Sequence, residues 1–518
     1  MKTQHREFLK LILTAAAIIL AAQVLLHGEA EAQAAATTAT RKLAPPHGAG
    51  KNEPMQILEI KGFLDLVTKG NDAYRAAEMN RVAAESYSYE AGLVLAPALI
   101  ANMTLASDGK PSPFPIPGFN YSSVDTNSYS AGVTKLFRNG IRTTFTYSAI
   151  DTDYVGLPGA QKYFEARPQI EATIPLWRNF WGRETVGTID AVRLGSLAKA
   201  KAQEAQAKGA LIDAEAAYWR LALSREALKV SKDAVDRADA LSGWTGRRVR
   251  LALSDRSESL QSTAQSKSRA LDYKTSEDDE RAARLAFNSA RGVSGDKVPE
   301  TLEVLNADLI AKWETPNRTT IRPDVEAARL QAEAAEANAK ASAERSKPTF
   351  EIFGLYAFNS PHKATQSEAL EASLKRDRPS TSYGLRLNMP LDFSAMKKAQ
   401  AGWSAEANAS RILISRRLFE QERDWNDLVS RFQLAREKIR LYEELEASQK
   451  EKLDYERTRQ KSGRSTVAQV ILFETDYEQT QFSRIRALAD VLSLNANMKL
   501  YGVAYDAPKS ASDGGAAE

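Results

Sequence analysis

The sequence predicts an α+β protein that contains an internal two-fold repeat, in which amphipathic strands precede very long antiparallel coiled-coil helices. Residues 167–182 read RPQIEATIPLWRNFWG, and residues 383–394 read YGLRLNMPLDFS. Both stretches alternate apolar and polar residues, continue with Pro-Leu and an aromatic residue, and precede a long charged segment. Alternation with period two is typical of a strand with one apolar and one polar face.

The N-terminal residues predict a secretory signal peptide over residues 1–32. Three basic side chains precede an apolar run at 11–26, and Ala30-Glu31-Ala32 fits the small-residue cleavage pattern. An uncleaved anchor is the less favoured alternative, because the run is shorter than the roughly 20 residues of a spanning helix. Residues 33–56 are expected to form a linker.

The composition argues against several classes of function. There is no Cys, and Lys+Arg 70 nearly balances Asp+Glu 66, so neither disulfides nor nucleic-acid binding is expected. The four histidines, His5, His27, His47 and His362, fall in the signal segment, the linker and a loop. Histidine-based catalytic groups and the usual zinc sites are therefore not expected. We expect no catalytic residue, no cofactor, no metal and no enzymatic activity.

The first repeat is predicted over residues 57–303. An Ala-rich helix leads to strands at about 97–107, 128–150 and 165–175, and a long helical hairpin follows at about 184–292. In the first strand Leu99, Ala101, Met103 and Leu105 share one face. An apolar outer face and a polar inner face are what a barrel wall in lipid requires. A soluble β-sandwich would need more strands of similar spacing in each half.

The second repeat is predicted over residues 304–503. A helix leads to strands at about 348–358 and 383–391, and a second long hairpin follows at about 395–502. At 1.5 Å per residue, the outgoing helix of each hairpin would be roughly 90–100 Å long, far more than a bilayer needs. Residues 504–518 are expected to be a disordered tail.

Aromatic residues follow the two Pro-Leu strand ends. Trp177, Phe180, Trp181 and Phe393 are predicted to lie at the membrane interface, where an aromatic ring can be apolar on one side and hydrated on the other. A role in a buried core is the alternative interpretation.

The sequence resembles the outer-membrane efflux protein family, the TolC-like exit ducts, over about residues 57–503. The residues that carry the resemblance are the two Pro-Leu strand ends, Arg322-Pro323-Asp324 at the start of the second repeat, and the stretches AEAAYWRLALSREALKVSKDAVDRADAL, QKSGRSTVAQVILFETDYEQTQ and LNANMKLYG. The resemblance implies a homotrimer whose β-barrel lies in the outer membrane of a Gram-negative bacterium and continues as an α-helical tunnel across the periplasm. Each chain supplies too few strands to close a barrel by itself, so several chains must share one barrel.

The resemblance also implies that the ends of the two helical hairpins meet a periplasmic adaptor (a membrane fusion protein) of an inner-membrane pump. It places Asp255 and Gln469 at a periplasmic gate. Gln469 and Leu472 lie where some members carry ring-forming aspartates, so a cation-blocked entrance is not expected. The residues assigned to the adaptor-binding tips are Leu251, Ala252, Leu253, Ser254, Asp255, Ser462, Gly463, Arg464, Ser465, Thr466 and Val467.

The sequence departs from the family pattern at residues 128–150, a hairpin around Asn139-Gly140. It either adds two strands to the sheet or projects outside the barrel rim, and projection is the favoured interpretation. The implied function is a passive exit duct of a tripartite export system, with small-molecule efflux favoured. A duct for type I protein secretion is the alternative, and an exported structural coiled-coil protein without a channel is less favoured.

Overall fold

The computed structural model describes residues 57–109, 121–157, 159, 162–303, 310, 313, 316–360, 365–375 and 378–502. The chain divides into two units, residues 1–57 and 58–518, and the described part of the second contains the large sheet and the long helices. The predicted signal peptide, the linker at 33–56, the tail at 504–518 and His362 lie outside the described residues.

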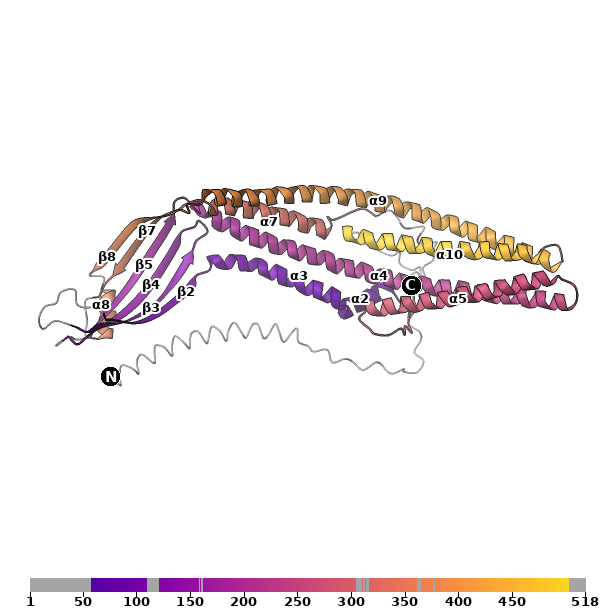
Figure 1. Ribbon diagram of the computed structural model, residues 1–518, viewed down its shortest axis with the longest axis horizontal. Helices are drawn as coiled ribbons and strands as arrows, with labels where there is room; N and C mark the ends of the chain where they lie inside the picture. Colours follow the sequence, from indigo (N-terminus) through magenta and orange to yellow (C-terminus); the bar gives the residue numbers. More distant parts are fainter. Residues whose placement is uncertain are drawn as a thin grey trace, which may run out of the picture. The chain divides into compact units, whose positions relative to one another are not determined.

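The second unit consists of one large sheet and a set of long helices (Figure 1). The strands of the large sheet are β2 (Ala98–Asp108), β3 (Ser123–Leu136), β4 (Arg142–Val155), β5 (Tyr163–Pro175), β7 (Thr349–Phe358) and β8 (Pro379–Asn388). The two-residue strands β1 (Ile57–Leu58) and β6 (Thr301–Leu302) form a separate pair. The α-helices are α2 (Ile60–Gly70), α3 (Asp72–Glu90), α4 (Arg183–Arg250), α5 (Arg256–Ala290), α7 (Pro323–Arg345), α8 (Gln366–Leu374), α9 (Phe393–Lys461) and α10 (Val467–Met498), and the 3-10 helices are η1 (Ala91–Leu95), η2 (Phe180–Gly182) and η3 (Lys499–Tyr501).

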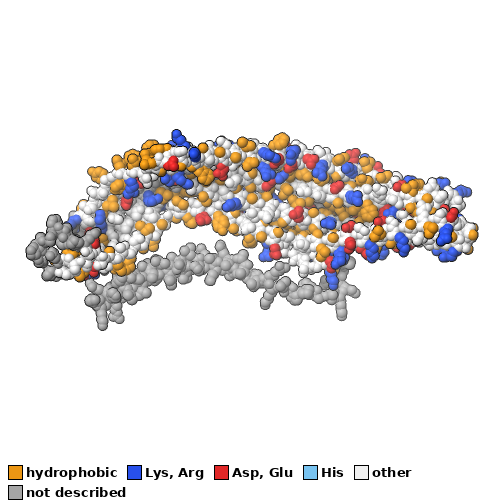
Figure 2. Space-filling model, in the orientation of Figure 1, with side chains coloured by type: hydrophobic (Ala, Val, Ile, Leu, Met, Phe, Trp, Pro, Cys, Tyr) orange, Lys and Arg blue, Asp and Glu red, His pale blue; other side chains and the backbone are white. Residues whose placement is uncertain are grey.

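The six strands are antiparallel and follow the order β2-β3-β4-β5-β7-β8. Met103 of β2 pairs with Tyr129 of β3, and Tyr129 pairs with Ala149 of β4, so these three side chains share one face. The same face carries Leu99, Ala101 and Leu105, whereas Asn102 and Thr104 lie on the other. The predicted alternation in the first strand is therefore confirmed. Figure 2 shows apolar side chains at the end of the unit that the sheet forms.

The hairpin at 128–150 lies in the middle of the sheet, so the expected projection from the rim is wrong. β3 pairs with β2 along its length, and β4 pairs with β5. Chain direction explains this position. β2 leaves the helices and β3 returns to them, so the turn at Asn139-Gly140 lies at the helical end of the sheet. Gly140 there lies against Asn179 and Pro175 rather than at the far rim.

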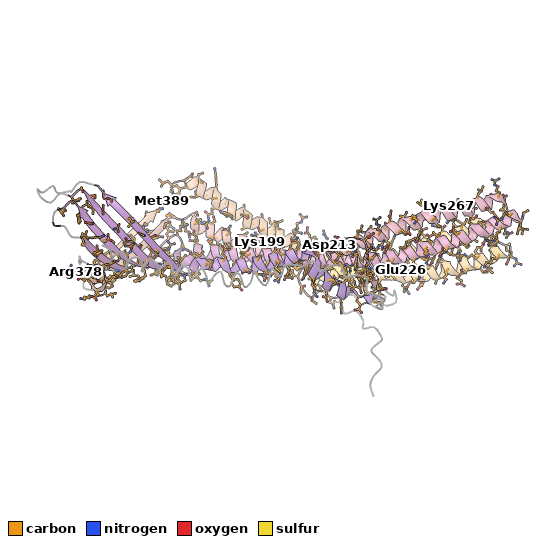
Figure 3. The ribbon with its side chains drawn as sticks, turned by 90° about the horizontal axis from the view of Figure 1, so that it is seen from below. Lys199, Asp213, Glu226, Lys267, Arg378 and Met389 are labelled. Atoms are coloured by element: carbon orange, nitrogen blue, oxygen red, sulfur yellow. The ribbon has the colours of Figure 1, made fainter. Side chains whose placement is uncertain are left out.

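The helices next to the sheet form a single layer in the order α3, α4, α7, α9. β2 follows α3, and β8 leads into α9, so each edge of the sheet continues into an edge of this layer. With 68 and 69 residues, α4 and α9 are each about 100 Å long. Figure 3 follows the first hairpin away from the sheet through Lys199, Asp213, Glu226 and Lys267.

Farther from the sheet, α5 returns along α4, and α10 returns along α9. The main core lies where these hairpins meet α2 and the buried side chains of Val298, Leu302, Ile310 and Trp313. Phe63 stacks on Phe287 with 4.4 Å between ring centroids, and the hydroxyl of buried Tyr218 donates to the carbonyl of Leu58 (2.5 Å). Glu215, also buried here, binds Lys499 of η3 through two contacts of 2.6 and 2.8 Å.

The Arg322-Pro323-Asp324 motif joins three segments. Pro323 occupies the first turn of α7, where its missing N–H is not needed. Arg322 binds Asp324 through two contacts of 2.6 and 2.9 Å, and its guanidinium also approaches Asp424 of α9 and the hydroxyl of Tyr501 (both 3.4 Å). Burial opposes ionisation of Asp324, but the hydrogen bonds from Arg322 outweigh it and lower its pKa.

The connection from β5 to α4 is a compact turn with positive φ at Asn179, Trp181 and Gly182. A Cβ atom at Gly182 would lie 1.8 Å from the carbonyl oxygen of Arg138 in the β3–β4 turn. Glu184 binds Arg178 (2.7 Å) and Arg345 of α7 (3.3 Å). Burial opposes ionisation of Glu184, but these arginines outweigh it and lower its pKa.

We predict that Gly182→Ala destabilises the protein by more than about 2 kcal/mol, because the methyl group meets backbone atoms at a positive φ. The control is Gly195→Ala in α4, where an added Cβ meets no atom within 4 Å. That change should stabilise the helix by about 0.5–1 kcal/mol. Thermal unfolding of the detergent-solubilised protein measures both, and equal effects would contradict the close-packed turn.

Candidate functional site

The first hairpin tip, residues 251–255, ends α4 with a hydrogen-bonded turn. The amide of Leu253 donates to the carbonyl of Arg248 (2.9 Å), and the amide of Ala252 donates to that of Val249 (3.0 Å). Ala252 has a φ of 57°, so the turn is a Schellman ending with a left-handed residue after the helix. The side chain of Arg248 closes it by donating to the carbonyl of Leu253 (2.9 Å).

The second tip, residues 462–466, repeats this geometry. The amide of Arg464 donates to the carbonyl of Arg459 (2.8 Å), and Gly463, with a φ of 70°, donates to Gln460 (2.9 Å). The side chain of Arg459 donates to the carbonyl of Arg464 (3.1 Å), as Arg248 does to Leu253 in the first tip. The two tips are therefore structural equivalents, with Gly463 in the place of Ala252.

A capping side chain starts the returning helix after each tip. Asp255 accepts from the amide of Ser257 (3.0 Å), and Thr466 accepts from the amide of Gln469 (3.3 Å). Such caps satisfy amides that have no partner within the helix. Ser465 also donates to the side chain of Gln469 (3.3 Å). Asp255 and Gln469 thus stabilise their own hairpins, and their role at a gate stays a prediction.

The tips differ in the side chains that they expose. Leu251 and Leu253 are 68% and 62% exposed, so the first tip presents two apolar side chains to solvent. Ser462, Gly463 and Arg464 are exposed at the second tip. Val467 is only 2% exposed and packs with Leu241, Leu453 and Val470. Among the predicted tip residues, Val467 therefore supports the turn from inside.

Ion pairs link the two hairpins behind the tips. Arg269 of α5 binds Glu478 (2.7 Å) and Thr475 (2.9 Å) of α10. Burial raises the pKa of Glu478 and outweighs the attraction of Arg269. The guanidinium of Arg237 lies 5.7 Å from the ring centre of Tyr477. The sequence does not reveal these contacts, because the spacing of residues along one helix carries no information on pairing between helices.

The aromatic residues at the sheet–helix boundary are exposed. Trp181 is 69% exposed, and Trp177 and Phe393 are about half exposed. Phe180 is less exposed, and its ring meets Trp181 edge-on. These aromatic side chains therefore do not belong to a buried core within a single chain. Their placement at a membrane interface stays a prediction.

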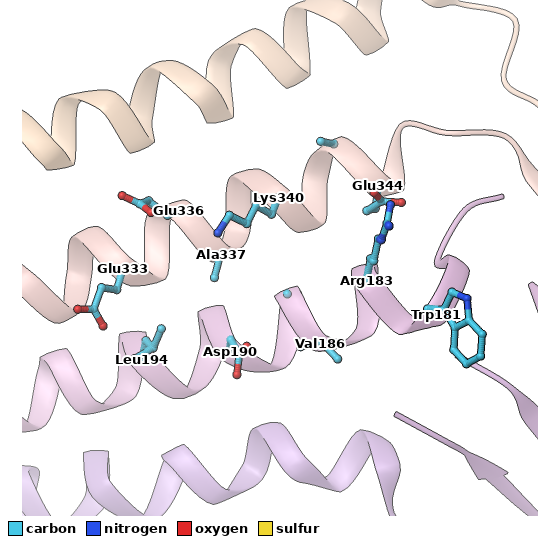
Figure 4. Close-up of a pocket in the computed structure, with 12 residues that line it drawn as sticks. Trp181, Arg183, Val186, Asp190, Leu194, Glu333, Glu336, Ala337, Lys340 and Glu344 are labelled. Atoms are coloured by element: carbon cyan, nitrogen blue, oxygen red, sulfur yellow. The ribbon is translucent and has the colours of Figure 1, made fainter. Parts of the chain in front are cut away.

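A groove of about 710 Å³ runs between α4 and α7 next to this boundary (Figure 4). Its walls combine small and apolar side chains with carboxylates such as Asp190 and Glu333, and with the cation Lys340. Among the described residues, no group of three or more His, Cys, Asp or Glu side chains is placed to hold a metal ion. The groove could not be predicted from the sequence, because it depends on how α4 and α7 pack together.

No family model and no curated protein matches the sequence. Solved structures match over most of the chain. VceC of Vibrio cholerae, an outer membrane protein, is 13% identical with a TM-score of 0.60, over 86% of this chain and 97% of that one. The MtrE outer membrane channel of Neisseria gonorrhoeae in its open state is 15% identical with a TM-score of 0.57, over 86% and 89%. The chain has the fold of bacterial outer-membrane channels.

The CmeC outer membrane channel of Campylobacter jejuni, 11% identical with a TM-score of 0.56, has the same channel fold over 86% of this chain and 85% of that one. Within the described part of this chain, no helix is sufficiently long and apolar to cross a membrane. The channel fold thus confirms the predicted architecture of strands followed by long helical hairpins.

We predict opposite effects from exchanging the left-handed residues of the two tips. Ala252→Gly should stabilise the first tip and Gly463→Ala should destabilise the second, each by about 1 kcal/mol, since only glycine adopts positive φ without a steric cost. Hydrogen exchange of the tip amides measures both changes. A change of the same sign at both tips would contradict their equivalence.

Proposed function

We propose that this protein is a passive exit duct of a tripartite export system in the outer membrane of a Gram-negative bacterium. Three copies would form one β-barrel continuous with a helical periplasmic tunnel. One observation carries the proposal: a sheet with one apolar face and two unpaired edges leads directly into helices about 100 Å long.

The two faces of the sheet suit lipid outside and water inside. Ile170, Ala172 and Ile174 of β5 lie on the apolar face together with Ile352 of β7. The opposite face carries polar and charged groups from neighbouring strands, including Thr144, Glu171, Glu351 and Arg386. A polar interior and an apolar exterior are the pattern of an outer-membrane barrel that holds water.

The edges of the sheet require further chains. Within the described residues, β2 and β8 are each paired on one side only. Unpaired backbone groups are very costly in hydrocarbon, so a membrane-embedded sheet of this kind must close. Three copies of the six-stranded sheet give eighteen strands. Barrels of about 16–18 strands leave an aqueous channel.

The helical layer is also incomplete in one chain. Its edge helix α3 exposes Met79 and Val82, and the opposite edge helix α9 exposes Ile412 and Phe419. A ring in which α3 of one copy packs on α9 of the next would cover both sets. Such a head-to-tail contact closes into a ring, in agreement with the trimer.

The helices extend far beyond the roughly 30 Å hydrocarbon core of a bilayer. The hairpin tips would therefore lie deep in the periplasm, where the exposed Leu251 and Leu253 offer apolar contacts to a periplasmic adaptor of an inner-membrane pump. Asp255 and Gln469 would lie at the periplasmic gate. Small-molecule efflux is the favoured task, and type I protein secretion remains the alternative. The amphipathic sheet argues against a structural coiled-coil protein without a channel.

We predict that the mature protein, extracted from outer membranes in detergent, has the mass of three chains and forms conducting pores in planar lipid bilayers. One sheet leaves two edges open, and three sheets supply the eighteen strands of a barrel that can hold water. Native mass spectrometry and bilayer recording measure the two properties. A folded monomer, or recovery of the protein in the soluble periplasmic fraction, would overturn the proposal.

The orientation of the sheet can be tested with a pair of neighbouring residues in β2. Met103→Arg places a charge at the middle of the apolar face and should cost about 2–4 kcal/mol in lipid. Asn102→Arg places the same charge on the polar face and should be tolerated. The yield of assembled protein in outer membranes compares them, and equal yields would contradict the assignment of the faces.

A further inference from the structure

Positive charge is concentrated at the two hairpin tips. Residues 247–258 contain four cationic and two acidic side chains, and residues 457–469 contain four cationic and no acidic side chains. The net charge of the whole chain is only +4, so the tips are more positive than the protein as a whole. Figure 2 shows Lys and Arg side chains gathered at the end of the unit that the hairpins form.

Part of this charge is used within the turns. Arg248 and Arg459 donate to the carbonyls that close the two tips, and Arg248 also lies over the ring of Trp244. Arg457 binds Glu474 of α10. These three cations are therefore structural.

Five other cations of the tips are exposed and form no ion pair within the described part of the chain. They come from both hairpins. These unpaired tip cations are Arg247, Arg250, Arg256, Lys461 and Arg464.

The acidic side chains in and directly before the two tip ranges have partners in their own hairpins. Asp255 caps α5, and Glu258 accepts a hydrogen bond from Ser254. Glu456 is buried, and it binds both Arg459 (3.2 Å) and Ser465. Each of these carboxylates thus has a partner in its own hairpin, although Asp255 is exposed, whereas the unpaired tip cations have no such partner among the described residues.

We propose that the unpaired tip cations form a basic ring at the periplasmic mouth, which makes the duct selective for anions over cations. The inference rests on the proposed trimeric duct, in which three copies bring fifteen such cations to one opening. Rings of Arg and Lys side chains select anions in pores. The favoured substrates are then molecules that carry carboxylate or phosphate groups.

Two physical features support selectivity at this place. Like charges that converge on a narrow opening raise the local concentration of counter-ions. The exposed residues that follow the second tip do not cancel the effect, because Gln469 and Leu472 bring no negative charge to the start of α10. The Debye length is about 8 Å at physiological ionic strength and shortens as salt rises, so the selectivity should weaken at high salt.

The test is the reversal potential of the assembled native protein in a planar bilayer with a tenfold gradient of KCl. We expect chloride to permeate at least about threefold more readily than potassium, and the ratio to fall at high salt. The variant with glutamine at all five positions (Arg247→Gln, Arg250→Gln, Arg256→Gln, Lys461→Gln and Arg464→Gln) should lose this preference. It leaves the turn-closing Arg248 and Arg459 intact.

Two control variants separate the ring from net charge and from folding. Five exposed lysines on the helix shafts, changed together to glutamine, remove the same charge elsewhere and should leave the ratio unchanged. Lysine in place of the four arginines among the unpaired tip cations (Arg247→Lys, Arg250→Lys, Arg256→Lys and Arg464→Lys) keeps the charge and should keep the preference for chloride. The shaft lysines are Lys232, Lys267, Lys398, Lys438 and Lys450.

The outcomes are distinguishable. A native pore that prefers potassium or has no preference overturns the basic ring but leaves the proposed duct intact. A preference unchanged in the glutamine variant also overturns the ring. If that variant does not assemble, the salt dependence of the native pore is the test. A chloride-to-potassium permeability ratio that falls at high salt supports the ring, and a ratio independent of salt overturns it. The absence of any native conductance would contradict the duct itself.

Discussion

The unpaired edges of the sheet are the constraint on which the proposed architecture depends. β2 and β8 each leave a row of backbone donors and acceptors without a partner in the described chain. Each edge strand is joined to a helix at the edge of the helical layer, β2 to α3 and β8 to α9. A neighbour that pairs with the sheet edge therefore also meets the exposed apolar side chains of the edge helix. In the proposed trimer, closure of the barrel and closure of the tunnel would be one event, because both would depend on the same interface.

The sequence predicted most of this fold, because its main signals are local. The alternation of apolar and polar residues indicated where the strands lie. The breaks between the long helices indicated the positions of the tips to within a few residues. The position of the 128–150 hairpin was wrong, because the alternation and the Asn-Gly turn identify a hairpin without identifying its neighbours. α4 continues through Gly243 and Gly246 to Arg250, although each glycine costs a helix roughly 1 kcal/mol, because Leu241 and Trp244 beside them belong to a packed apolar cluster. α8, a single short helix between β7 and β8, was not predicted, because its sequence has no clear hydrophobic periodicity.

At the candidate site, the sequence identified the turns but not the use of each side chain. Val467 was grouped with the docking residues, yet it packs inside the hairpin with Leu453. Asp255 was assigned to a gate, and the structure shows it capping α5. Both roles depend on contacts across a turn or between helices, which residue type alone does not specify. The matched turn-closing arginines are recognisable only after the two tips are compared in space.

The two added strands also set the width of the wall that each chain contributes. Six strands spaced about 4.8 Å apart and tilted by about 40° occupy roughly 38 Å of a barrel's circumference. The four helices next to the sheet, at about 8–10 Å between axes, occupy roughly 32–40 Å. A sheet of four strands with the same tilt would supply only about two thirds of that width. With the central hairpin, the sheet and the helical layer match, so the bore of a three-chain ring would pass from strands to helices without a narrowing at the junction.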